Sequence, residues 1–265
     1  MSSARRLPVG LLPAAGRGTR LHPYRAPKEL LPLALRSERS PDEVVPTPVC
    51  MFALRALRRA GVERCVVAIS DGKQDLIRTL GDGGDQGLSL AYLHQAEPRG
   101  LTDVVRRAAP WLGDHDVVFA MPDTVFFPED GLAILHRQLV DTGADIMLGL
   151  FHADEPERLG AVHIDGRNTV LEIHDKPGHR QWPWCWGVLA WSVRFTRFCA
   201  QWEEARGAGS EGVLGHAMEA ARRAGLVVRA HCFTEGLFHD VGTPAGLGAA
   251  MRALVARGVI FGTST

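Results

Sequence analysis

Short apolar segments alternate with longer segments of helical period through the first half of the chain, and this alternation is the strongest constraint on its fold. The apolar segments are rich in β-branched residues and have the length of buried strands. The predicted strands are Val9–Ala14, Cys65–Ser70, Leu88–His94 and Val117–Met121, and the predicted helices between them are Met51–Ala60, Gln74–Leu80 and Thr102–Leu112. We therefore expect an α/β fold with a Rossmann-like, mixed, mainly parallel central sheet flanked by helices.

The second half of the chain is less regular. The segments Ala161–Ile164 and Thr169–Ile173 predict a hairpin that turns at Asp165-Gly166, and hence a small β-rich subregion. The other predicted strands are Asp145–Phe151, Cys185–Trp191 and Leu226–Cys232, and the predicted helices are Gly131–Thr142, Val193–Glu204, Glu211–Ala224 and Pro244–Arg257. The polar, proline-bearing segment Arg36–Pro48 is predicted as a connection. We expect one domain over residues 1–265, with a nucleotide-binding half of about 1–125 and an acceptor-binding half of about 126–265.

Composition excludes several classes of protein. With 30 basic and 30 acidic residues and 46% hydrophobic residues, the chain resembles neither a disordered protein nor one that binds nucleic acid mainly by charge. No apolar run approaches the ~18 residues that span a bilayer, so no membrane association is expected. The five cysteines are widely spaced and form no C-x-x-C pair, which favours free thiols and a cytoplasmic location.

Lysine is rare in this chain. Of the 30 basic residues 27 are arginines, and the lysines are Lys28, Lys73 and Lys176. A bias toward arginine accounts for the arginines but not for these three exceptions. Because a lysine ammonium is a compact point charge and a guanidinium is a planar fork, a site that needs one is poorly served by the other.

A glycine-containing loop follows the first predicted strand. The segment Gly10-Leu-Leu-Pro-Ala-Ala-Gly-Arg-Gly-Thr-Arg20 places Gly16, Gly18 and Thr19 where backbone N–H groups could approach phosphate oxygens. The loop is not a dinucleotide fingerprint, since Leu21 stands where the third glycine belongs, and it lacks the Gly-Lys-Ser/Thr end of a Walker loop. By itself the pattern is also compatible with a tight turn.

Several ordered motifs, taken together, resemble the sugar-1-phosphate nucleotidyltransferases, also called nucleoside-diphosphate-sugar pyrophosphorylases. The resemblance is greatest to the glucose-1-phosphate thymidylyltransferase and uridylyltransferase branches, and it covers nearly the full chain. The motifs are G-R-G-T-R-L-H-P…A-P-K-E-L-L-P-L over 16–33, L-G-D-G over 80–83, G-L-S-L-A-Y over 87–92, Q-A-E-P-R-G-L over 95–101, the strand that ends at Asp123, D-K-P over 175–177 and F-H-D-V-G-T over 238–243.

The resemblance implies attack by a phosphate oxygen of a sugar phosphate on the α-phosphorus of a nucleoside triphosphate, with release of pyrophosphate. It implies Mg²⁺ as the cofactor, held by Asp123 and Asp240, whose convergence from distant segments the fold must provide. Arg20 would hold the leaving pyrophosphate, Lys28 the triphosphate and Lys176 the acceptor phosphate. The implied partners are therefore a nucleoside triphosphate and a phosphorylated small molecule, and a homo-oligomer is an open expectation.

Further contacts follow from the same motifs. The nucleotide-binding set that the resemblance implies is Ala14, Ala15, Gly16, Gly18, Thr19, Glu29, Gln95, Gly100 and Asp123, and the acceptor-binding set is Thr124, Gly160, Asp175, Lys176, Trp186 and Gly187. The glutamine would pair with a pyrimidine edge. The tryptophans between 182 and 191 are better explained by packing, with Trp184 or Trp186 as the exceptions that could stack on a sugar.

The chain also departs from the family pattern. Pro122-Asp123-Thr124 replaces the usual Gly-Asp-Asn, Asp175 stands where glutamate is common, and the segment Leu35–Thr47 carries an insertion. These departures leave the acceptor open. Two alternatives remain beside a uridylyl- or thymidylyltransferase: a cytidylyltransferase for a non-sugar phosphate or phosphonate such as phosphocholine, because the A-A-G loop occurs there too, and a nucleotide-binding regulator without catalysis.

Overall fold

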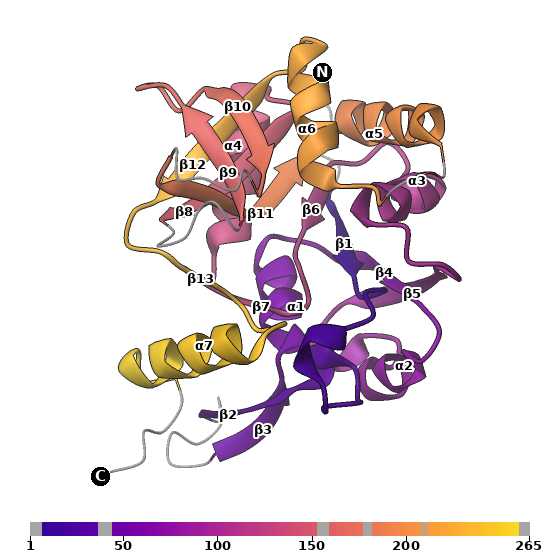
Figure 1. Ribbon diagram of the computed structural model, residues 1–265, viewed down its shortest axis with the longest axis vertical. Coiled ribbons are helices and arrows are strands. Elements are labelled where there is room, and N and C mark those ends of the chain that lie inside the picture. Colours follow the sequence, from indigo (N-terminus) through magenta and orange to yellow (C-terminus); the bar gives the residue numbers. More distant parts are fainter. Residues whose placement is uncertain are drawn as a thin grey trace.

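The fold is built on one nine-stranded mixed sheet. The computed structural model describes residues 7–36, 44–152, 159–176, 182–207, 209 and 211–259. Four strands of the first half lie parallel in the order β6-β1-β4-β5 (Figure 1). Their bounds are β1 Val9–Pro13, β4 Arg64–Ile69, β5 Ser89–His94 and β6 Val117–Phe119. This half of the sheet confirms the predicted parallel arrangement.

The second half of the sheet is mixed. Strand β11 (Trp184–Trp191) lies antiparallel to β6 and also to β8 (Ile146–His152), which in turn pairs in parallel with β12 (Val228–Phe233). The predicted hairpin is present as β9 (Gly160–Ile164) and β10 (Val170–Asp175), and it joins the sheet through β11. The Asp165 side chain closes its turn by accepting the amides of Arg167 and Thr169, each at 2.8 Å. The predicted fold class, including this β-rich subregion, is confirmed.

Helices cover both faces of the sheet. Their bounds are α1 Cys50–Arg59, α2 Gln74–Leu80, α3 Leu101–Leu112, α4 Gly131–Thr142, α5 Val193–Arg206, α6 Leu214–Arg223 and α7 Pro244–Ala256, with 3-10 turns η1 Thr19–Leu21, η2 Lys28–Leu30 and η3 Gly84–Gln86. Adjacent residues of a strand point to opposite faces. Leu12 accordingly packs in the core with α1 and α4, and Leu11 packs in the core with α3, α5 and α6. None of the described helices is both long and apolar enough to cross a membrane.

Two small antiparallel sheets were not predicted. The predicted connection Arg36–Pro48 contains β3 (Val44–Pro48), which pairs with β2 (Pro32–Arg36). Proline lacks an amide hydrogen, so Pro46 and Pro48 weaken the strand pattern in the sequence, although a two-stranded sheet leaves edge positions where proline is tolerated. Residues 37–43, within the predicted insertion, lie outside the described residues.

The second of these sheets joins distant segments of the chain. Strand β7 (Thr124–Phe127) pairs with β13 (Leu237–Asp240), with Asp240 opposite Thr124. Both small sheets and α7 share a third core that includes Leu33, Val125 and Leu254. Figure 1 shows α7, β2 and β3 at the opposite end of the molecule from β9, β10 and α6. The pairing of β7 with β13 is what brings the carboxylates of the two halves together.

Candidate active site

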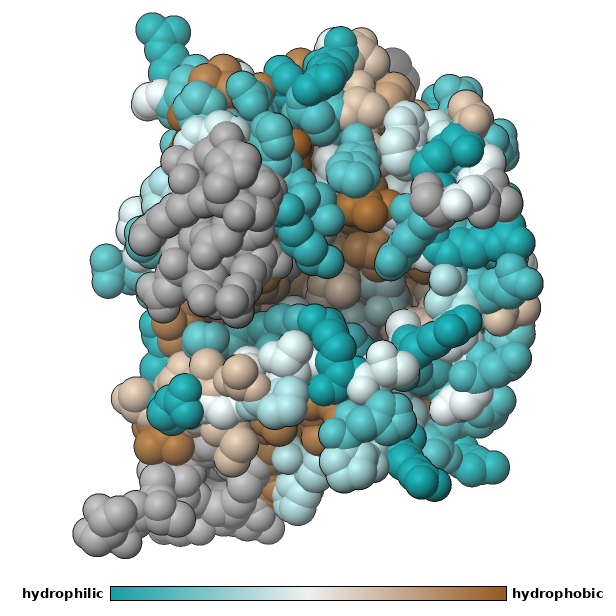
Figure 2. Space-filling view, in the orientation of Figure 1, coloured by the Kyte–Doolittle hydropathy of each residue, from teal (hydrophilic) through white to brown (hydrophobic). Residues whose placement is uncertain are grey.

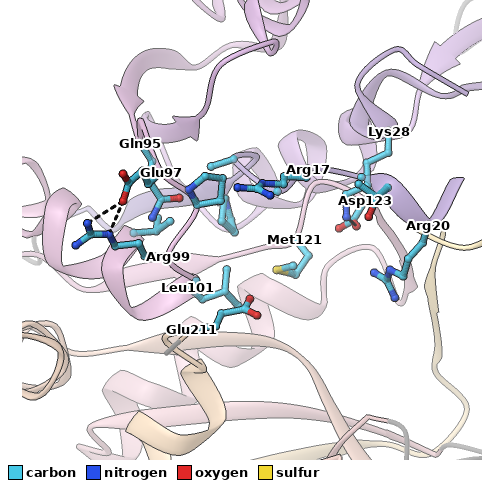
Figure 3. A pocket seen from close by; sticks show the side chains of 18 of the residues that line it. Arg17, Arg20, Lys28, Gln95, Glu97, Arg99, Leu101, Met121, Asp123 and Glu211 are labelled. Carbon is cyan, nitrogen blue, oxygen red and sulfur yellow. Dashed lines mark hydrogen bonds and ion pairs between the residues drawn. The ribbon is translucent and has the colours of Figure 1, made fainter. Parts of the chain in front are cut away.

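A polar cleft lies at the carboxyl ends of the parallel strands, where open α/β sheets bind their ligands. Its volume is about 950 Å³, and Figure 2 shows it as a hollow on one face of the molecule. Its lining comprises Pro13, Ala15, Gly16, Arg17, Gly18, Thr19, Arg20, Lys28, Glu29, Gln95, Glu97, Pro98, Arg99, Gly100, Leu101, Val104, Met121, Asp123, Lys176, Gly209 and Glu211. In Figure 3, Gln95, Glu97 and Arg99 lie at one end, and Lys28, Asp123 and Arg20 at the other.

The predicted phosphate loop borders this cleft. Ala14, which precedes it, is buried and donates its amide to the Ala68 carbonyl at 2.7 Å, so this predicted residue is occupied by the sheet and lies outside the cleft lining. Ala15, Gly16, Gly18 and Thr19 line the cleft. A methyl group placed on Gly16 would meet nothing within 4 Å, so its surface is open to an approaching phosphate.

Lys28 pairs with Asp123 at the phosphate end of the cleft. The Lys28 ammonium donates to the Asp123 carboxylate, which is 3% exposed at the residue level. Burial lowers the pKa of Lys28, but the charge and hydrogen bond of Asp123 outweigh burial and hold it above its ordinary 10.5. The lysine is therefore charged at neutral pH, as a phosphate-binding group must be.

Asp240 reaches the same place from the far end of the chain. Its Oδ1 accepts the Gly242 amide at 2.7 Å, and its Oδ2 lies 3.4 Å from a guanidinium nitrogen of Arg20. The backbone amide of Val241 donates to the Asp123 carbonyl at 2.9 Å and ties the two segments together. A methyl group placed on Gly242 would lie 2.7 Å from Asp240 Oδ1 and 3.2 Å from Asp123 Oδ2. The two carboxylates thus face one small volume.

The donor set suits magnesium. No cluster of three or more histidine, cysteine, aspartate or glutamate side chains with metal-binding geometry occurs among the described residues. Mg²⁺ does not require one, because in nucleotide enzymes one or two carboxylates commonly bind it together with substrate phosphates. Asp123 and Asp240 supply two hard oxygen ligands beside the loop where phosphates would lie.

Glu29 is paired with a lysine whose role the sequence did not indicate. Lys73 Nζ donates to Glu29 Oε2 at 2.6 Å, and both residues are at least 95% buried. The other oxygen, Oε1, is buried without a hydrogen-bond partner in the described part of the chain. Burial raises the pKa of Glu29, and Lys73 partly offsets this rise. Glu29 borders the cleft, but its carboxylate is engaged by Lys73, so its predicted contact with the nucleotide stays a prediction.

Gln95 follows β5 at the other end of the cleft and is held from two sides. Its backbone amide donates to the Ile69 carbonyl at 2.7 Å, and its side-chain Nε2 donates to Asp103 Oδ2 at 2.7 Å. Gly100, at φ +98°, approaches Gly212 so closely that a methyl group on it would lie 2.4 Å from the Gly212 carbonyl oxygen. Only glycine satisfies both the backbone angle and this contact. Both predicted nucleotide-binding residues line the cleft.

Lys176 lines the cleft from the position directly after β10. Its backbone is left-handed, with φ +46°, and its amide donates to the Leu159 carbonyl at 2.9 Å. A lysine in this conformation costs about 1–2 kcal/mol, a strain that is characteristic of functional sites. The strained backbone and the position in the cleft both agree with the predicted role of an acceptor-phosphate ligand.

Four other predicted acceptor residues lie outside the cleft lining: Gly160, Asp175, Trp186 and Gly187. A methyl group on Gly160 would lie 2.0 Å from the indole nitrogen of Trp186, and one on Gly187 would lie 2.3 Å from the Phe238 ring. The Trp186 nitrogen is buried with no hydrogen-bond partner among the described residues. A methyl group on Gly215 would come within 4 Å of both Trp186 and Asp175, so these side chains are neighbours. Both glycines pack against aromatic rings, and their contact with an acceptor stays a prediction.

Thr124 lies outside the cleft lining, and several residues in or beside the cleft were not predicted. The Thr124 hydroxyl donates to the Met121 carbonyl at 2.9 Å, and the residue is buried outside the cleft lining. Sequence reasoning did not identify the roles of Lys73 or Asp103, nor did it include Arg17 among the cleft residues. The arginines three and four residues after Asp103 were a readable signal for a paired helix carboxylate. Lys73 had no such signal, because its partner lies 44 residues away in the sequence.

Comparisons with known proteins agree with this geometry. Over 173 residues the chain is 29% identical to the glucose-1-phosphate thymidylyltransferase of Streptomyces griseus. The aligned segment covers 64% of this chain and 44% of the relative. The low-salt glycan biosynthesis nucleotidyltransferase Agl11 of Haloferax volcanii is 27% identical over 171 residues, or 63% of this chain and 44% of the relative. The chain spans about half the length of the curated relatives it matches.

Solved structures share the fold. A putative glucose-1-phosphate thymidylyltransferase from Bacillus anthracis, in complex with a sucrose, superimposes with a TM-score of 0.80 at 21% identity, over 96% of this chain and 97% of that one. A UDP-glucose pyrophosphorylase complexed with UDP-glucose gives 0.78 at 16% identity, over 95% and 100%. Residues 9–257 match the nucleotidyl transferase family. The chain therefore belongs to the nucleotidyl transferase family, and its resemblance to the sugar-1-phosphate nucleotidyltransferases is confirmed.

Proposed function

We propose that this chain transfers a nucleoside monophosphate from dTTP or UTP to a sugar 1-phosphate, giving a nucleoside-diphosphate sugar and pyrophosphate. The observation that carries the proposal is the convergence of Asp123 and Asp240 with Lys28 and Arg20 beside the glycine loop. Lys176 lines the same cleft. This arrangement suits a reaction in which two polyanions must be brought together.

The chemistry needs little besides positioning and positive charge. The sugar phosphate is ionised at neutral pH, so its oxygen attacks the α-phosphorus without a general base while the bond to the β-phosphate breaks and pyrophosphate leaves. Lys28 would hold the triphosphate, Arg20 the departing pyrophosphate and Lys176 the incoming phosphate. Asp123 and Asp240 would bind Mg²⁺, which when bound neutralises charge on the phosphate oxygens.

Pyrophosphate release tests the proposal directly. ATP, GTP, CTP, UTP and dTTP are each combined with a panel of hexose 1-phosphates and with phosphocholine, with and without Mg²⁺. Mg²⁺-dependent turnover of UTP or dTTP with a sugar 1-phosphate is the expected result. Turnover confined to CTP and phosphocholine would move the assignment to a cytidylyltransferase. Tight nucleotide binding without turnover for any pair would leave only the regulator.

Lys176 provides a matched variant. Lys176→Gly removes the ammonium but suits the left-handed backbone at φ +46°. We expect the rate to fall ~10²–10³-fold, the cost of losing one preorganised charge in the transition state. Stability should stay constant or rise by up to about 1 kcal/mol, because glycine relieves the backbone strain. Asn168→Gly, at the other positive φ of a non-glycine residue in the described chain, is the control for strain relief outside the cleft. A Lys176→Gly enzyme with unchanged turnover would remove Lys176 from the mechanism.

A further inference from the structure

A charge cluster centred on the buried carboxylate of Asp103 contacts Gln95 at one end of the cleft. Asp103 is on the first turn of α3 and is 2% exposed. Its Oδ2 accepts from Gln95 Nε2 and from Arg107 Nε, each at 2.7 Å. Its Oδ1 accepts from Arg106 Nη2 at 2.7 Å and from Arg106 Nε at 3.2 Å. All these contacts are donations to the carboxylate.

This environment keeps Asp103 ionised. Burial alone would raise its pKa, but the hydrogen bonds from Gln95, Arg106 and Arg107 outweigh burial and hold the pKa below the ordinary 3.8. An ionised carboxylate accepts hydrogen bonds and donates none. Gln95 must therefore present its NH₂ group to Asp103, because the opposite amide orientation would set the carbonyl oxygen against a negative charge.

The fixed amide has a consequence at the cleft. A free glutamine can rotate its amide by half a turn and exchange the positions of donor and acceptor. Gln95 cannot do so without losing the bond to Asp103. Its Oε1 accepts no hydrogen bond within the described part of the chain, while the residue lines the cleft. An acceptor at a fixed place is thus available to a nucleobase.

We propose that Asp103, clamped by Arg106 and Arg107, fixes the Gln95 amide so that the cleft accepts a uracil or thymine edge and rejects cytosine. This inference rests on the proposed function and refines it. Uracil and thymine carry an N3–H donor beside the O4 acceptor, which match the Oε1 acceptor and the remaining N–H of Gln95. Cytosine carries an N3 acceptor beside an N4–H donor, so each of its groups meets its like.

Asp103 acts in this proposal as a positioning residue. It touches the substrate through Gln95 alone, and its effect is on the choice between bases. A well-placed pair of hydrogen bonds discriminates between bases by roughly ten- to a hundredfold. A merely structural Asp103 would change the affinity for all three nucleotides together and leave their ratio constant.

The test is calorimetric titration of the full chain with UTP, dTTP and CTP in the presence of Mg²⁺ and without an acceptor. The wild type should bind UTP or dTTP roughly ten- to a hundredfold more tightly than CTP. Asp103→Asn and Asp103→Ala release the amide and should reduce this ratio about tenfold. Asp103→Glu, which still only accepts, should keep most of it. Asp75→Asn is the matched control, because Asp75 also pairs with an arginine three residues on, Arg78, but outside the cleft.

If the Asp103 variants do not fold, Gln95→Met still tests the inference. Gln95→Met keeps the side-chain volume without polar groups, and its ratio should approach one. Equal binding of CTP and UTP by the wild type, or an unchanged ratio in Asp103→Asn or in Gln95→Met, would overturn the inference. Absence of turnover with every sugar 1-phosphate would instead overturn the proposed function, because the base preference is measured without an acceptor.

Discussion

Lys28 and Glu29 are neighbours in one 3-10 turn, and each forms an ion pair with a residue of another segment. Lys28 pairs with Asp123, and its side chain is 13% exposed where the turn meets the cleft. Glu29 pairs with Lys73, and these side chains are 1% and 6% exposed. Both are pairs of a lysine and a carboxylate, and they share one turn. The first pair is nevertheless accessible from the cleft, whereas the second is almost completely buried.

This difference in exposure indicates different roles for the two pairs: the first can contact a ligand, and the second supports the turn. A substrate phosphate or a metal ion can replace one member of the Lys28–Asp123 pair, because both residues line the cleft. Lys73 lies outside the cleft lining, and the side chains of Lys73 and Glu29 are 6% and 1% exposed, so a ligand in the cleft does not reach the place of Lys73. We infer that the sealed pair holds the turn in the position from which Lys28 acts.

The largest effect is expected from Lys73→Met. Removal of one member of a buried pair leaves an uncompensated charge, at a cost of about 3–5 kcal/mol in the free energy of unfolding. The double variant Glu29→Met/Lys73→Met should recover most of this loss, because both charges are gone. Urea denaturation at pH 7 measures both. A loss below about 1 kcal/mol for the single variant would contradict a sealed pair.

The loss in Lys73→Met should also depend on pH. Burial raises the pKa of Glu29 above the 4.5 that it has in the unfolded chain, and Lys73 opposes this rise. An acid whose pKa is raised by folding stabilises the folded state below its unfolded pKa and loses that contribution as the pH rises through the folded pKa. Without Lys73 the folded pKa rises further. The destabilisation relative to wild type should therefore be small up to the folded pKa of Glu29 in the wild type, which lies above 4.5. At higher pH it should grow by up to about 1.4 kcal/mol per pH unit, until Glu29 ionises in the variant as well.

If the loss of stability in Lys73→Met did not change with pH, Glu29 would have to stay charged in the variant or be neutral in both proteins. The measurement is urea unfolding of both proteins at matched pH values from acidic to neutral. Glu29→Gln/Lys73→Met serves as the control, because its amide does not titrate and its difference from wild type isolates the wild-type Glu29 contribution.

Lys28→Met should cost less stability and respond to magnesium. The Lys28 side chain is 13% exposed at the cleft, so its removal lets water reach Asp123, and we expect a loss of about 1–3 kcal/mol in the free energy of unfolding. Millimolar Mg²⁺ should restore part of it, because the cation can take the place of the ammonium beside Asp123. Turnover should still fall ~10²–10³-fold. The measurement is thermal unfolding with and without Mg²⁺. If Mg²⁺ restored the stability of Lys28→Met and Lys73→Met equally, the two pairs would not differ in their access to the cleft.

Most of the fold could be predicted because its elements depend on local patterns. Strand β4 and helix α3, for example, are encoded by a run rich in β-branched residues and by a helical period. The pairing of β7 with β13 could not be read, since four-residue strands carry little pattern and the partners lie more than a hundred residues apart. This pairing nevertheless places Asp240 beside Asp123, so the sequence resemblance indicated two acids that only the fold could join.

The candidate site divides in the same way. Residues in contiguous motifs, such as Gly16, Lys28 and Gln95, line the cleft as expected. The residues that hold them in place were missed or had no assigned role. Lys73 supports the turn of Lys28, and Asp103 supports Gln95, each through a contact with a partner on another element. A supporting contact has no motif of its own, because its geometry depends on how two elements pack.

The smallest effect on stability is expected from Arg20→Gln, which removes an open pair at the same end of the cleft. Arg20 is 61% exposed, Asp240 is 33% exposed, and their separation is 3.4 Å. Solvent screens such a pair, so its loss should change the free energy of unfolding by less than about 1 kcal/mol. Pyrophosphate release should nevertheless slow, because Arg20 is proposed to hold the leaving group. Arg78→Gln, which removes an even more exposed pair with Asp75 outside the cleft, should also change the free energy of unfolding by less than about 1 kcal/mol but should leave the rate unchanged. If Arg20→Gln destabilised the chain as much as Lys73→Met, exposure would no longer explain the difference between the pairs.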